Sequence, residues 1–270
     1  MGAALRWPEM TRSISLNFTP EVQYLLRIAD TCLILSQRLG EWCGHGPVLE
    51  EDIALTNMAL DLLGQTRGVL TRAGQIEGQG QGRVCDEDQL AFLRDERDYR
   101  NLTIAELPRG DFAFTVLRNL MLATWLKLHW DRLQASTDAE LAAIAGKALK
   151  EARYHQQHAA DWVVRLADGT PESRRRMHAA LTELWRYVPE MFAHDDVDDA
   201  AVASGLGPAR SALREAWGIE MAAVFDAAQL TPPSAGPWLS TGTLGVHSEH
   251  MGRVLAEMQH LQRAFPGAAW

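Results

Sequence analysis

Carboxylates and imidazoles at helical spacing are the residues of this chain that could bind a metal. Glu151, His155 and His158 are separated by four and three positions, so they share one face of a helix. Asp30 and Asp61 stand at similar depths on two other expected helices, among apolar neighbours. Two irons between helices take one Glu from each of two helices and a Glu-x-x-His pair from each of the other two. Carboxylates and imidazoles suit such cations.

The pattern for two irons is incomplete in this sequence. The residue three positions after Asp61 is Gly64, and Gln65 follows it, so no imidazole completes that pair. The next long helix has Ala123 and no carboxylate at the corresponding depth. Too few ligands remain for two irons.

Two interpretations of these residues stay open. In the first, Asp30, Asp61, Glu151 and His155 are the ligands of a divergent iron-dependent oxidase that is active on its own. In the second, which we favour, they and Gln65 are vestigial site positions, so that the chain has no catalytic residue, no metal and no bound cofactor. They would then form a buried or interfacial polar network. Buried carboxylates need Arg, Lys or His partners in that case.

The elements that position these residues are predicted to be helices. Apolar residues recur every three or four positions along most of the chain, and no segment alternates with period two. Four long helices are expected: one ending near residue 44, and three over about 47–76, 111–135 and 138–167. Further helices are expected within 86–101, over 171–195 and 208–230, and from 247 to before 266, with loops at 78–82, 195–207 and 231–245.

This order predicts an all-α fold, a ferritin-like four-helix bundle with additional C-terminal helices. Residues 1–19 are expected to be a flexible N-terminal extension, and residues 20–270 a single domain. At the start of the last helix, His247 or Ser248 is expected to cap. The nine Trp residues are expected to be core or partner-facing anchors.

The composition excludes some classes of partner and indicates the cellular compartment. A net charge of -9 argues against nucleic acid or an anionic membrane as the main partner. Cys32, Cys43 and Cys85 are odd in number and lack CxxC spacing, so neither disulfides nor a thiolate metal site is indicated. With no signal core and no apolar stretch long enough to span a bilayer, we expect a cytoplasmic protein.

Several strings of this sequence are long and specific. They include Leu35-Ser36-Gln37-Arg38-Leu39-Gly40-Glu41-Trp42-Cys43-Gly44-His45-Gly46-Pro47, Leu60-Asp61-Leu62-Leu63-Gly64-Gln65 and Lys150-Glu151-Ala152-Arg153-Tyr154-His155. These strings resemble the structural C subunit of bacterial phenylacetyl-CoA epoxidase complexes, which act in phenylacetate catabolism. The C-terminal run from His247 through Leu255-Ala256-Glu257-Met258-Gln259 to Trp270 is similar too. The resemblance covers the chain from about residue 20 to its end.

The resemblance implies a multicomponent monooxygenase that epoxidises the aromatic ring of phenylacetyl-CoA. A homologous A subunit would carry the di-iron site, a small B subunit would join the complex, and a reductase would supply electrons through NADPH, FAD and an iron–sulfur centre. This chain would be the non-catalytic scaffold, so helix faces with exposed Trp and Leu are expected to meet the A subunit. Relatives can carry an acidic residue where this chain has Ala123.

Overall fold

The computed structural model describes residues 13–79, 84–234 and 236–268, and the regular elements in those residues are helical. The prediction of an all-α fold is therefore confirmed. The four long helices are α1 (Pro20–Gly40), α2 (Leu49–Glu77), α5 (Phe112–Leu133) and α6 (Ala139–Ala167). Local signals set their starts. Thr19 caps α1 by accepting from the backbone N–H of Val22, and Asp138 caps α6 in the same way for Leu141.

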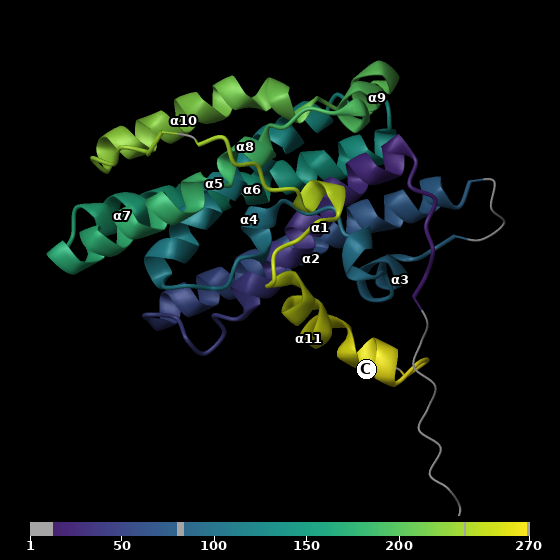
Figure 1. The fold of residues 1–270 in the computed structure, drawn as a ribbon, viewed down its shortest axis with the longest axis horizontal. Coiled ribbons are helices and arrows are strands. Elements are labelled where there is room, and N and C mark those ends of the chain that lie inside the picture. The colour runs from purple at the N-terminus through teal and green to yellow at the C-terminus, as the bar shows by residue number, and fades with distance from the viewer. Residues whose placement is uncertain (1–12, 80–83, 235, 269–270) are drawn as a thin grey trace, which may run out of the picture.

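The long helices pack in two pairs, α1 along α2 and α5 along α6, and α2 also contacts α6 (Figure 1). Helices α1 and α5 are buried on almost every side because their apolar residues cover more than one face. Trp125 and Trp130 on α5 lie fully in this core. A polar side chain on the buried sides of α1 or α5, such as Asp30, is therefore held in an apolar environment.

Shorter elements connect and cover the long helices. Between α2 and α5 lie α3 (Glu87–Phe92), η1 (Glu96–Asp98) and α4 (Thr103–Glu106). After α6 come α7 (Pro171–Trp185), α8 (Val188–Met191), α9 (Asp196–Ser204), η2 (Arg210–Leu213), α10 (Arg214–Ala227), η3 (Gly242–Leu244) and α11 (Met251–Ala264). Helices α10 and α11 lie at opposite edges of the molecule (Figure 1).

Two boundaries predicted from the sequence were wrong. The expected loop over 195–207 contains α9, because Asp195 and Asp198 form a reciprocal capping box that starts a helix. The fifth predicted helix ends at Trp185 instead of near residue 195. Pro189 lacks the N–H that a continuing helix would direct at the carbonyl of Trp185.

Parts of two predictions lie outside the described residues. The glycine-rich loop expected over 78–82 follows the end of α2, and residues 80–83 are not described. Residues 1–12 of the predicted extension are also outside, whereas Ile14 and Asn17 donate backbone hydrogen bonds to the carbonyl of Leu93 and the carboxylate of Glu77. Across the described ranges, every helix is too short or too polar to cross a bilayer.

Candidate functional site

Asp30 is a buried carboxylate that is held by an arginine. It is fully buried on α1, as its apolar neighbours predicted. The two guanidinium Nη atoms of Arg94 donate to the two carboxylate oxygens, one of them at 2.9 Å, and the backbone N–H of Arg100 donates to Oδ2 at 2.8 Å. Burial lowers the pKa of Arg94, but the adjacent Asp30 outweighs burial and raises the pKa overall. Asp30 and Arg94 thus form a buried, charged pair.

The other candidate residues meet across the contact between α2 and α6. Nε2 of His155 lies 3.0 Å from Oδ2 of Asp61. One helical turn along, Nε2 of Gln65 donates to Oε2 of Glu151 at 3.0 Å. Each helix therefore contributes two side chains at a spacing of four, and they form two cross-helix pairs.

Gln65 bridges this row of pairs to the core. Its side chain is almost fully buried, and its Oε1 accepts from the indole N–H of Trp130 at 3.2 Å and from the thiol of Cys32 at 3.7 Å. Burial, with the nearby charges of Asp30 and Glu151, raises the pKa of Cys32, so the thiol keeps the proton that it donates. The Gln65 amide thus accepts from core donors and donates to a carboxylate without a charge of its own.

His155 is a neutral imidazole at physiological pH. Burial lowers its pKa, and the hydrogen bond and charge of Asp61 only partly oppose this. Because a carboxylate can only accept, Nε2 of His155 carries the proton and donates it to Asp61. Closer to the start of α2, His158 makes a similar pair with Glu51 at 2.9 Å.

These positions do not fit a di-iron site. Across the described ranges, no three His, Cys, Asp or Glu side chains are arranged to hold a metal ion. At the corresponding depth α5 supplies Ala123 and Thr124, and the Thr124 hydroxyl donates to the carbonyl of Leu120. The structure brings Asp61, Gln65, Glu151 and His155 together in the expected polar network. The prediction that Asp30 belongs to the same network was wrong, because Arg94 and Arg100 hold its side chain on the side of α1 toward η1.

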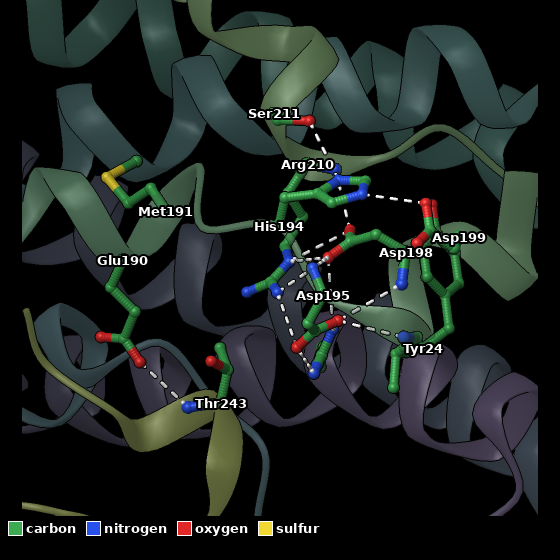
Figure 2. Close-up of polar contacts among 12 residues, drawn as sticks. Tyr24, Glu190, Met191, His194, Asp195, Asp198, Asp199, Arg210, Ser211 and Thr243 are labelled. Atoms are coloured by element: carbon green, nitrogen blue, oxygen red, sulfur yellow. Dashed lines mark hydrogen bonds and ion pairs between the residues drawn. The ribbon is translucent and has the colours of Figure 1, made fainter.

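A second cluster of buried charges was missed by the sequence analysis (Figure 2). Arg210 donates from Nη2 to Asp198 at 2.9 Å, and Arg27 on α1 donates from Nη1 to Asp195 at 2.9 Å. Burial opposes ionisation of Asp195, but Arg27 and Arg210 lower its pKa well below the usual value. The cluster attaches α9 and η2 to α1. Arg27 and Asp195 are 168 residues apart, so no local spacing could reveal them.

A third missed feature anchors the segment between α10 and α11. Glu190 is buried, and its carboxylate accepts from the backbone N–H groups of Thr103 and Thr243 at 3.0 and 2.9 Å and from the hydroxyl of Ser240 at 2.6 Å. Its contact with Thr243 is drawn in Figure 2. One acidic side chain therefore joins α4, α8 and η3.

His247 anchors the same segment and is not a helix cap. Helix α11 starts at Met251 with His250 at its N-cap position, so neither expected residue occupies the cap, although the Ser248 hydroxyl accepts from the backbone N–H of His250 at 3.3 Å in the turn before the helix. Nδ1 of His247 lies 2.8 Å from the Glu106 carboxylate, and Nε2 lies 3.2 Å from the carbonyl of Tyr99. Both partners are acceptors, so both ring nitrogens donate and the ring is an imidazolium. Burial lowers the pKa of His247, but Glu106 outweighs burial and raises the pKa overall.

The tryptophans that the structure describes belong mainly to the core, whereas Trp7 and Trp270 lie outside the described residues. Trp125, Trp130 and Trp217 are buried, and the indole N–H groups of Trp125 and Trp217 donate to backbone carbonyls. Trp238 is exposed, but most of the other exposed large apolar side chains are aliphatic. The exposed large apolar side chains of the described residues are thus mostly Leu, Ile and Val.

Comparison with known proteins agrees with the resemblance seen in the sequence. A family model described as phenylacetic acid catabolic protein matches residues 8–270. The C subunit of 1,2-phenylacetyl-CoA epoxidase from Escherichia coli (strain K12) is 46% identical over 247 residues, which cover 92% of this chain and 98% of that protein. The family match includes every candidate position described above.

Proposed function

Because the chain belongs to the family of phenylacetic acid catabolic proteins, we propose that it is the non-catalytic structural subunit of a di-iron monooxygenase that epoxidises the aromatic ring of phenylacetyl-CoA. In this proposal the chain is a ferritin-like bundle that supports a homologous di-iron A subunit. The near full-length similarity to the C subunit of an epoxidase supports it. The long helices pack as two pairs, α1 with α2 and α5 with α6, and such a bundle requires this arrangement.

The observation that carries the non-catalytic role is the pairing of Asp30 with Arg94. Both carboxylate oxygens accept from the guanidinium, which supplies the positive charge that a metal ion would supply. A divalent cation beside Arg94 would meet a fixed like charge in a region closed to water. On α2, Gln65 presents its amide N–H to Glu151 and so satisfies that carboxylate without a metal.

The remaining components follow from the same family. The A subunit would hold the iron, a small B subunit would join the two, and a reductase would deliver electrons from NADPH through FAD and an iron–sulfur centre. A scaffold needs a large apolar surface for its partner. Exposed aliphatic side chains on the described surface can supply it: Val48, Leu49, Ile53, Leu60, Ile219, Leu239, Leu244 and Val246.

Co-expression with a homologous di-iron A subunit tests the proposal. We expect the two chains to co-purify, and the iron to stay with the A subunit when the chains are separated. Epoxidation should require both. Near-stoichiometric iron on this chain, with O2 consumption by the chain alone, would instead favour an iron-dependent oxidase that uses Asp30, Asp61, Glu151 and His155.

A further inference from the structure

The outermost stripe of α2 is apolar, although it faces solvent. Leu49, Ile53 and Leu60 expose 71%, 52% and 61% of their surface, and Asn57 and Gly64 are exposed between and beyond them. The solvent face of a helix is normally charged or polar. Three large aliphatic residues in line on that face indicate that another surface covers them.

The spacing of this stripe is that of a helix-pairing seam. Ile53 and Leu60 belong to the row 50, 53, 57, 60, 64 and 67, whose steps alternate between three and four as the contact positions of a coiled coil do, and Leu49 lies at the edge of this row. Over six such positions the stripe stays within about 100° of the helix circumference. Asn57 lies inside the seam, where a single polar residue fixes the register of pairing. The expected occupant is therefore another helix.

The seam is complementary to itself when read in the opposite direction. With a second α2 antiparallel and the twofold axis between positions 58 and 59, Glu50 faces Arg67, Ile53 faces Gly64, and Asn57 faces Leu60. The first pair joins opposite charges. The second sets a bulky side chain against a glycine, and a Cβ at Gly64 would meet no atom within 4 Å, so that position is open. A twofold contact of identical surfaces requires this kind of match.

We propose that the isolated chain pairs with a second copy of itself through this seam, with the two α2 helices antiparallel. Arg67 is 70% exposed in its side chain and holds Glu87 of its own chain at 3.2 Å. Its planar guanidinium has five N–H donors, so donors remain for Glu50 of the second copy beside the one given to Glu87. This pairing concerns the chain without its partners and does not depend on the proposed function.

Charge reversal with analytical ultracentrifugation tests the register. Glu50→Arg alone places arginine against Arg67 at both ends of the pair, and Arg67→Glu alone places glutamate against Glu50. Each variant should dimerise at least about tenfold more weakly than the native chain. An equimolar mixture of the two variants should form a heterodimer of nearly native affinity, because both ends then join opposite charges.

Matched controls separate the seam from general surface effects. Ile53→Glu should abolish dimerisation, whereas Ile219→Glu, at a similarly exposed position on α10, should leave it unchanged. Circular dichroism would check that each variant keeps its helix content. A native chain that is monomeric throughout the concentration range, or a variant mixture no better than its components, overturns the proposal. So do seam variants that dimerise normally but no longer co-purify with the A subunit, since the seam would then belong to that subunit.

Discussion

Two regions of this molecule occupy the positions that metal ligands would take, and they satisfy their carboxylates in opposite ways. At α1 the carboxylate of Asp30 is fully buried and is neutralised by Arg94. At the contact of α2 with α6, Asp61 and Glu151 are partly open to solvent and accept from the uncharged groups of His155 and Gln65. The first region holds its positive charge in the core, whereas in the second the nearest donors are neutral and the charged partner is Lys147 at the surface, 3.7 Å from Glu151.

The difference follows from burial. A carboxylate that is removed from water loses more hydration free energy than a hydrogen bond from one neutral donor returns. Asp30 therefore requires a cationic partner. The side chain of Asp61 keeps 38% of its exposure, and water supplies what His155 does not. Asp30 and Asp61, at similar depths in the sequence pattern, are therefore stabilised by different partners.

The largest expected effect is at the buried pair. Arg94→Met should lower the free energy of unfolding by about 3–5 kcal/mol, because it leaves the Asp30 charge buried without its partner. Urea unfolding followed by circular dichroism measures this. The double variant Asp30→Asn with Arg94→Met removes both charges and should recover part of the loss. A single variant within about 1 kcal/mol of the native chain would show that Asp30 is not held as an ion.

A substitution at Gln65, which connects the cross-helix pairs to the core, should lower the free energy of unfolding by less than Arg94→Met does. Gln65→Leu removes the acceptor of the buried Trp130 indole N–H and the donor to Glu151, so we expect a loss of about 1–3 kcal/mol. Gln157→Leu, on the outer side of α6, is the matched control and should change stability by less than about 0.5 kcal/mol. Equal effects of the two variants in urea unfolding would contradict the role given to Gln65.

The two histidines should give stability changes of opposite sign with pH. His247 has a raised pKa in the folded chain, so its contribution is complete below the unfolded value of about 6.5 and is lost as pH rises through the folded pKa. His247→Gln should cost about 1–2 kcal/mol at acid pH and much less at alkaline pH. Unfolding free energies across this range, compared between native and variant, give the difference. A constant difference would mean that the Glu106 pair does not involve an imidazolium.

His155 should give the smallest of these effects. Its pKa is lowered in the folded chain, so stability is complete above about pH 6.5 and falls as pH drops toward the folded pKa, because only the unfolded chain then takes up the proton. His155→Gln should reduce this acid slope and leave the alkaline region unchanged. Nuclear magnetic resonance titration of the ring gives the pKa directly, and a raised value would contradict the account.

Local pattern predicted much of the fold. The three- and four-residue apolar steps indicated the four long helices, and Asp138, the first residue of the predicted range 138–167, caps α6. The prediction of a loop over 195–207 was wrong. The acidic, Ala- and Gly-rich composition of this segment is typical of a loop, but the capping box and the burial of Val197 and Ala201 make it a helix. Tertiary burial decided that element, and composition does not report it.

The sequence predicted the part of the candidate site that depends on spacing within helices, and it could not predict the part that depends on how distant segments cross. Asp61, Gln65, Glu151 and His155 lie on two adjacent helices at a spacing of four, so the sequence could place them on facing sides. The partner of Asp30 could be expected by type, because a buried carboxylate needs a cation. Its identity as Arg94 depends on how the segment after α3 crosses α1, and no spacing in the sequence encodes that crossing.

Titration of the isolated chain with ferrous iron under anaerobic conditions tests the central claim most directly, because it asks whether the candidate ligand positions accept a metal. The account predicts no saturable, near-stoichiometric binding, with the same result for the native chain and for Asp61→Asn. Binding of two irons per chain that is lost in Asp30→Asn and in His155→Gln would contradict it.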